Sequence, residues 1–181
     1  MTRREIFLLA AGLALGTLIG LAYIFTSDRV AQRKASTEAR QVGVGYPAPD
    51  FTLEGLDGKP ATLADFRGKA LVLNFWATWC TPCKAEMPML NEYAGRYADE
   101  LVVVGLNYGE SKEFAQDFVT ENGITFPILL DPSSSTGADY MIRGFPTTYF
   151  IDSEGVLRSL HIGQLSQELL DDYLQTIGVA P

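Results

Sequence analysis

The chain has 181 residues, of which 47% are hydrophobic, and a formal net charge of −8. That length suits one ordinary domain with an appendage. The charge is uneven: residues 1–45 carry six Lys/Arg against three Asp/Glu, whereas residues 46–181 carry eight against nineteen. An acidic region without a basic stripe repels the phosphate backbone, which excludes nucleic acid as a partner.

The amino-terminal region contains a run of twenty residues, 6–25, without a charged side chain. A helix of that length spans roughly 30 Å, the thickness of a bilayer core. We therefore expect a cytoplasmic arm over residues 1–5, a single transmembrane anchor over 6–26 and a polar tether over 27–45. The alternative is a cleaved signal peptide, whose apolar region is normally about 7–15 residues long and is followed by a small-residue cleavage site. The sequence after the run, Tyr-Ile-Phe-Thr-Ser-Asp, is a poor site of that kind.

Residues 46–181 are expected to form one domain in which strands alternate with helices, because β-branched runs alternate with segments of helical apolar spacing. The expected elements, in chain order, are a hairpin around Asp57-Gly58, a buried strand 71–76, a helix 81–97 that contains Pro88, a strand 101–106, a helix 111–121 with Phe114, Phe118 and Val119 inward, a strand 128–130, a short helix 135–140, a hairpin of strands 147–151 and 156–162, and a helix 167–177. This pattern predicts an α/β domain with a mixed sheet.

Cys80 and Cys83 are the only cysteines of the chain. A C-x-x-C between a strand and a helix is typical of reversible dithiol–disulfide chemistry. A zinc site is the first alternative, but it needs four ligands, and the single histidine, His161, is distant in sequence. A structural staple is the second, but it would close a very small loop and would constrain little of the unfolded chain. We therefore predict a redox-active Cys80–Cys83 disulfide, with no metal and no cofactor.

Motifs around and beyond the cysteines resemble those of a known family. They are Asn74-Phe75-Trp76-Ala77-Thr78-Trp79-Cys80-Thr81-Pro82-Cys83, then Glu86 and Pro88, later Gly144-Phe145-Pro146-Thr147-Thr148, and Ile162-Gly163 before the last helix. On these residues the chain resembles the thioredoxin superfamily, and more narrowly the membrane-anchored TlpA/ResA-like thiol–disulfide oxidoreductases within the redoxin (AhpC/TSA-like) group. The resemblance implies a thioredoxin fold with an amino-terminal hairpin and a strand–helix insertion at residues 101–122. It also shows a departure, since Asn74 stands where thioredoxin has a buried aspartate.

The expected roles of the site residues follow from the helix and the resemblance together. Cys80 should lie exposed at the helix amino terminus, where the helix dipole stabilises a thiolate, and should attack the substrate disulfide. Cys83, one turn further and more buried, should then resolve the mixed disulfide. Glu86 matches a family glutamate and could carry the proton of Cys83, the alternative being an ordinary surface glutamate.

The resemblance also implies which residues contact the substrate. Pro146 matches the family's cis-proline, and the backbone of Phe145 before it would pair with a substrate strand. The residues predicted to bind substrate are Trp79, Thr81, Pro82, Phe145, Pro146 and Thr147.

The resemblance implies that the protein reduces protein disulfides. The short amino-terminal arm, and a redox pair with no other thiol in the chain, favour placing the domain on the extracytoplasmic face of the cytoplasmic membrane. A monomer on a single anchor is the default expectation. Apocytochrome c would be the client, and a transmembrane thiol protein would supply electrons. A thiol peroxidase is one alternative, but its P-x-x-x-T/S-x-x-C context is missing, since Asn74 and Ala77 occupy those positions. A copper chaperone is another, but such relatives use a C-x-x-x-C spacing with a partner histidine. A peroxide assay and a copper titration distinguish these functions.

Overall fold

The structure is a computed structural model that describes residues 42–181. The predicted arm and anchor, and the tether up to residue 41, lie outside the described residues. Within residues 42–181 none of the helices combines the length and the apolar character needed to cross a bilayer. The cysteine pair and every other predicted site residue fall inside the described part.

Seven strands form one mixed sheet in the order β2-β1-β5-β4-β3-β6-β7. The strands are β1 (Thr52–Gly55), β2 (Pro60–Thr62), β3 (Ala70–Trp76), β4 (Leu101–Tyr108), β5 (Ile128–Asp131), β6 (Thr147–Ile151) and β7 (Leu157–Ile162). The β3–β4 and β4–β5 pairs are parallel, and the other four pairs are antiparallel. The predicted mixed sheet and both predicted hairpins, β1–β2 and β6–β7, are therefore confirmed.

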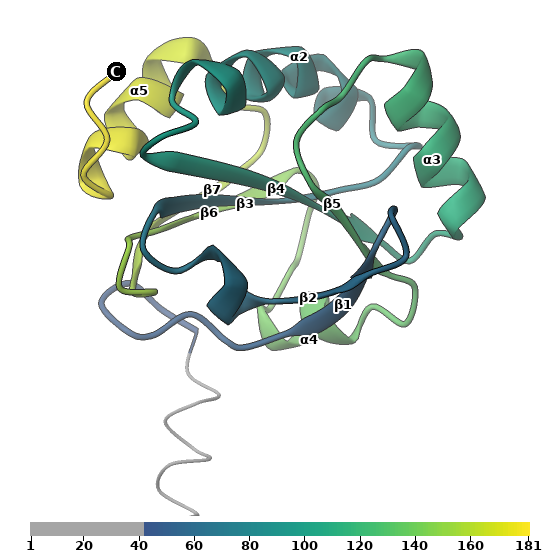
Figure 1. The fold of residues 1–181 in the computed structure, drawn as a ribbon, viewed down its shortest axis with the longest axis horizontal. Helices are drawn as coiled ribbons and strands as arrows, with labels where there is room; N and C mark the ends of the chain where they lie inside the picture. Colours follow the sequence, from purple (N-terminus) through teal and green to yellow (C-terminus); the bar gives the residue numbers. More distant parts are fainter. Residues whose placement is uncertain (1–41) are drawn as a thin grey trace, which may run out of the picture. The chain divides into compact units, whose positions relative to one another are not determined.

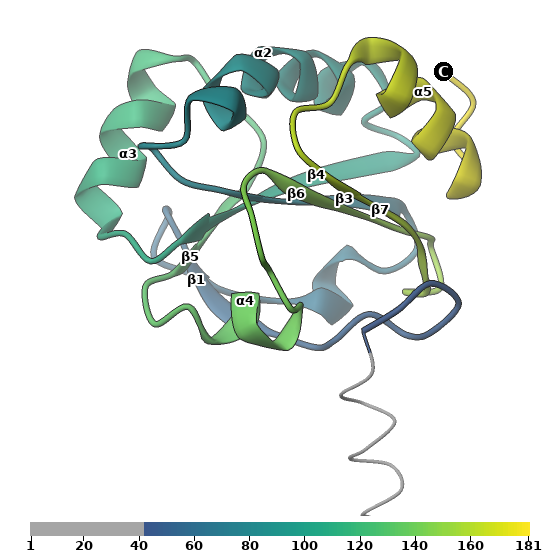
Figure 2. The ribbon, with the colours of Figure 1, turned by 180° about the vertical axis from the view of Figure 1, so that it is seen from behind.

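Helices cover both faces of this sheet. Figures 1 and 2 show α2 (Thr81–Arg96), α3 (Lys112–Glu121) and α5 (Gln167–Thr176) together on one face, with α4 (Ser135–Asp139) and the 3₁₀ helix η1 (Leu63–Phe66) on the other. The segment expected as an insertion contains β4 and α3, and β4 lies between β3 and β5 in the middle of the sheet.

Strand β3 leads directly into the segment that carries the two cysteines. All seven of its residues are buried, and the six apolar ones alternate between two hydrophobic clusters, one on each face of the sheet. Val72 and Trp76 belong to the cluster that also contains both cysteines, whereas Leu73 and Phe75 belong to the opposite one. Because both faces of β3 are packed, the position where the strand ends, just before the cysteine motif, is fixed by the core.

One prediction about α3 is wrong. Phe114 was expected to face inward with Phe118, but its side chain is 65% exposed. Ala115 is fully buried and occupies the face of the helix that packs on the sheet. Phe114 is one residue earlier, about 100° around the helix, and so faces away from the core.

Candidate active site

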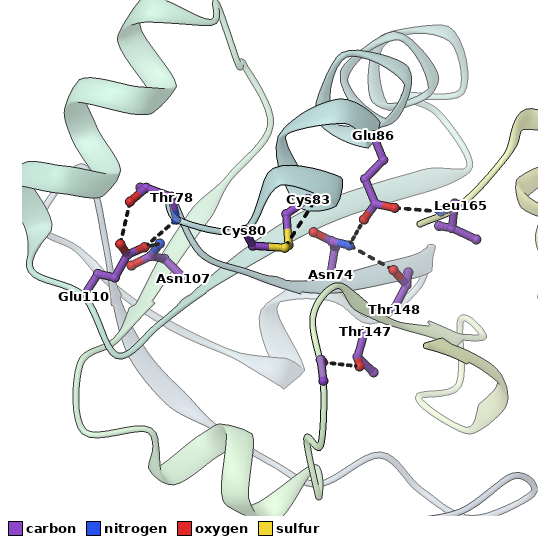
Figure 3. The surroundings of a disulfide bond; sticks show 11 residues. Asn74, Thr78, Cys80, Cys83, Glu86, Asn107, Glu110, Thr147, Thr148 and Leu165 are labelled. Atoms are coloured by element: carbon purple, nitrogen blue, oxygen red, sulfur yellow. Dashed lines mark hydrogen bonds between the residues drawn. A yellow bond between two sulfur atoms is a disulfide. The ribbon is translucent and has the colours of Figure 1, made fainter. Parts of the chain in front are cut away.

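The cysteine pair lies where the chain passes from β3 into α2. Cys80 is the N-cap residue of α2, and its Sγ accepts a hydrogen bond of 3.2 Å from the backbone N–H of Cys83. Thr81 and Pro82 fill the first helical positions, where proline is tolerated because its missing N–H would have no partner in the helix. Cys80 and Cys83 are joined as a disulfide (Figure 3). The sulfur of Cys80 thus sits at the positive end of the α2 dipole, which favours a thiolate after reduction.

The expectation that Cys80 is exposed is wrong for this oxidised form. Cys80 is 5% exposed and Cys83 is fully buried. The disulfide draws the Cys80 sulfur toward Cys83, and both residues belong to the hydrophobic cluster under α2. The expected order of burial holds, with Cys80 the more accessible of the two.

An aromatic rim borders the disulfide. Trp79, immediately before Cys80, is 62% exposed, and its ring packs edge to face on that of Phe145, with 5.4 Å between centroids. Tyr108, at the end of β4, packs on Phe145 from another direction at 5.0 Å. The structure therefore brings together two of the residues predicted to bind substrate, from segments 66 positions apart in sequence.

The remaining predicted binding residues lie at the start of β6 and at the start of α2. The Phe145–Pro146 peptide bond is cis, as the resemblance implied. Thr147 is buried, and its Oγ1 donates a 2.8 Å hydrogen bond to the carbonyl oxygen of Gly144. This bond ties the start of β6 to the loop, while Thr81 remains exposed at the helix start and Pro82 half-buried. The contact of the predicted binding residues with substrate remains a prediction.

Glu86 is a buried carboxylate one turn after Cys83. It is 1% exposed, and it accepts hydrogen bonds from Asn74 Nδ2 at 2.7 Å and from the backbone N–H of Leu165 at 2.8 Å. Burial raises the pKa of Glu86 to about 7, although the hydrogen bonds from Leu165 and Asn74 oppose that rise. The alternative of an ordinary surface glutamate is therefore wrong, because an exposed carboxylate would not be desolvated in this way.

Asn74 and Thr148 extend the polar group around Glu86. Asn74 Nδ2 also donates to Thr148 Oγ1 at 2.9 Å, across the antiparallel β3–β6 pair in which the two residues face each other. Figure 3 shows the amide nitrogen of Asn74 directed toward Glu86 and Thr148. A single buried cluster thus links α2, β3, β6 and the segment before α5 beside the disulfide.

Sequence reasoning missed Glu110, which holds the loop that carries Trp79 and Cys80. Its Oε2 accepts hydrogen bonds from the backbone N–H of Thr78 at 2.7 Å and from Asn107 Nδ2 at 2.8 Å. Its Oε1 accepts from Thr78 Oγ1 at 2.5 Å. Figure 3 shows this group on the opposite side of the disulfide from Glu86. The only sequence signal was an acidic residue shortly after a strand end, which is too common to single it out.

We expect Glu110→Ala to lower the free energy of unfolding by about 1–3 kcal/mol, because it leaves the donors of part-buried Thr78 and buried Asn107 without this acceptor. Glu110→Gln is the matched control. The amide oxygen of the glutamine can take the position of Oε2, and its NH2 group can donate to the Thr78 hydroxyl. The loss of unfolding free energy in Glu110→Gln should therefore be clearly smaller than in Glu110→Ala. Denaturant unfolding of both variants measures the difference, and equal losses would contradict the assignment.

Within residues 42–181, no three His, Cys, Asp or Glu side chains cluster closely enough to hold a metal ion. His161 lies on β7, and its Nδ1 is 3.4 Å from the hydroxyl of Tyr173 on α5. The cysteines themselves are the reactive groups that this geometry presents.

Known proteins are similar to this chain in sequence. The profile of the AhpC/TSA family matches residues 44–160. The thiol–disulfide oxidoreductase ResA of Bacillus subtilis (strain 168) is 32% identical over 178 residues, covering 98% of this chain and 96% of ResA. The thioredoxin-like protein YneN of the same organism is 39% identical over 140 residues, covering 75% and 82%.

Solved structures agree with the sequence relatives. A protein described as a thiol:disulfide interchange protein DsbE, from Chlorobium tepidum, superposes with a TM-score of 0.71 at 31% identity, covering 76% of this chain and all of that one. The fold is therefore thioredoxin-like. Taken with the C-x-x-C disulfide at the start of α2, these likenesses place the chain in the AhpC/TSA family, as a thiol–disulfide oxidoreductase of the ResA/DsbE type.

Proposed function

We propose that this protein is a membrane-tethered, extracytoplasmic reductant of protein disulfides, with apocytochrome c as its client and a transmembrane thiol protein as its electron donor. The observation that carries the reductase proposal is the Cys80–Cys83 disulfide at a helix amino terminus, beside exposed Trp79. Such a surface can receive an unfolded or extended polypeptide, which a closed pocket could not.

The tether and the compartment are proposed from the sequence. The run 6–25 is uncharged and long enough to span a bilayer. A chain whose only thiols are the reactive pair also suits an oxidising compartment. The alignment with ResA runs over 178 residues and so takes in this segment as well as the domain.

The proposed reaction moves two electrons from the dithiol to the substrate. The Cys80 thiolate attacks the substrate disulfide, forming a mixed disulfide and releasing one substrate thiolate, which takes a proton from solvent. Cys83 then gives its proton to Glu86 and attacks the Cys80 sulfur, so that the second substrate sulfur leaves as a thiolate. Cys83 and Glu86 are three residues apart on α2, which places their Cβ atoms about 5–6 Å apart.

The client is tested with reduced full-length protein and apocytochrome c oxidised at its haem-binding cysteines. We expect stoichiometric loss of the client disulfide and appearance of the Cys80–Cys83 disulfide, both followed by thiol labelling and mass spectrometry. Cys80→Ala should give no transfer. If apocytochrome c stays oxidised while a generic disulfide is reduced, the client is wrong but the reductase activity stands. Hydrogen peroxide and cuprous ion, offered in parallel, test the two alternatives.

A further inference from the structure

Three buried side-chain polar atoms in the described part of the chain have no hydrogen-bond partner: Asn74 Oδ1, Trp76 Nε1 and Asn107 Oδ1. An unpaired buried acceptor is costly, so each such atom calls for an explanation. Trp76 Nε1 is a hydrogen-bond donor and cannot accept a hydrogen bond. Asn107 lies beside Glu110, on the far side of the disulfide from Glu86 (Figure 3). Asn74 Oδ1 is therefore the acceptor of interest.

The orientation of the Asn74 amide is set by its two partners. Its nitrogen donates both to Glu86 Oε1 and to Thr148 Oγ1. A flipped amide would place its oxygen against the carboxylate oxygen of Glu86, two acceptors facing each other when Glu86 is ionised. The oxygen is thereby turned the other way, and Figure 3 shows it pointing toward the disulfide.

Reduction supplies a donor that the disulfide lacks. When a dithiol reduces the pair, the Cys80–Cys83 bond breaks, an S–S bond forms in the donor, and two electrons pass to the pair. The Cys80 sulfur, which already accepts from the backbone N–H of Cys83, is favoured as a thiolate at the helix start. One proton then goes to solvent, and the other stays on Cys83, which is fully buried.

We propose that Asn74 Oδ1 accepts the hydrogen bond of the Cys83 thiol in the reduced protein, and that this contact tunes the redox equilibrium of the pair. This proposal rests on the reversible dithiol–disulfide chemistry of the proposed function and adds a residue that regulates that chemistry. The acceptor is satisfied when the pair is reduced and orphaned when it is oxidised. Asn74 thus favours the reduced form of the pair. The pair is therefore a weaker reductant than it would be with an apolar residue at position 74.

The equilibrium with glutathione tests this in the full chain. We expect Asn74→Leu to shift the equilibrium about tenfold toward the disulfide, which is about 30 mV for a two-electron couple. Thr148→Val is the matched control. It removes the partner of the Asn74 amide nitrogen on β6 and leaves the amide oxygen facing the disulfide. The glutathione equilibrium of this variant should therefore stay near that of the unaltered chain.

An effect through Glu86 must be separated from an effect on the sulfur, because Asn74→Leu also removes a hydrogen bond to that carboxylate. The same substitution is therefore made in a Glu86→Gln background. A shift that persists there supports the contact with Cys83, and one that vanishes assigns the effect to Glu86.

A spectroscopic measurement needs no Asn74 variant, so it can be made even if Asn74→Leu does not fold. In Cys80→Ala the chain keeps a single thiol, that of Cys83, whose infrared S–H stretching band reports its hydrogen bond. We expect the lowered frequency of a bonded thiol. The frequency of a free thiol would overturn the proposal. If the unaltered chain does not exchange with glutathione at all, the proposed function fails instead, which is a distinguishable result.

Discussion

Cys80→Ala should abolish thiol–disulfide exchange, and Cys83→Ala should convert the protein into a trap for its substrate. Cys80 caps α2, and it is the more accessible sulfur of the pair, so without it no thiolate can reach a substrate disulfide. We expect the exchange rate to fall by on the order of a thousandfold or more, as for loss of other enzymatic nucleophiles. Cys83→Ala retains the attack but lacks the buried thiol that resolves the product.

Mass spectrometry of each variant after incubation with a disulfide-bonded protein separates these outcomes. Cys83→Ala should carry the substrate as a covalent adduct that dithiothreitol releases, and Cys80→Ala should carry none. An adduct on Cys80→Ala would reverse the roles of the two cysteines.

The largest expected pH effect on stability belongs to Glu86. Its folded pKa of about 7 lies above the ordinary value of 4.5, so between these pH values the folded protein binds more protons than the unfolded chain. The stabilising contribution of Glu86 is complete below about pH 4.5 and is lost as the pH rises through 7. The loss is about 1.4 kcal/mol per pH unit over that window, or about 3 kcal/mol in total.

Glu86→Gln removes this titration, since glutamine stays neutral. Relative to the unaltered protein, we expect the free energy of unfolding of the variant to rise by about 3 kcal/mol between pH 4 and pH 8, whatever the absolute offset from a changed hydrogen bond to Leu165. Glu92→Gln is the matched control, because Glu92 lies on α2 with its side chain 60% exposed. Denaturant titrations of the oxidised proteins across that range measure the effect. Parallel curves for Glu86→Gln and the unaltered protein would contradict it.

Much of the fold could be predicted because each element carries its own periodicity. The largely apolar run of β3 and the turn residues at Asp57-Gly58 depend only on neighbouring positions, and the structure confirms both elements. The cysteine pair was also visible locally, as two unique residues at a strand–helix junction. The cis bond at Pro146 came from the family resemblance.

The contacts that complete the site could not be predicted, because they depend on register and packing. The parallel register pairs Trp76 with Asn107, and this alone brings Thr78 next to Glu110, 32 residues away. The direction of the Asn74 amide depends equally on two partners, 12 and 74 residues distant. Helical spacing likewise could not show that Ala115, rather than Phe114, would face the sheet.

The reduction potential of the Cys80–Cys83 pair tests the central claim most directly. The full chain is equilibrated in thiol–disulfide buffers of defined potential, and the fraction of disulfide is read by alkylation and mass spectrometry. A reversible two-electron transition near the reducing end of the thioredoxin fold, at about −270 mV, is the result we expect of a dedicated reductant. A transition near the oxidising end, at about −120 mV, would make the protein a disulfide donor and would contradict the proposed reduction of apocytochrome c.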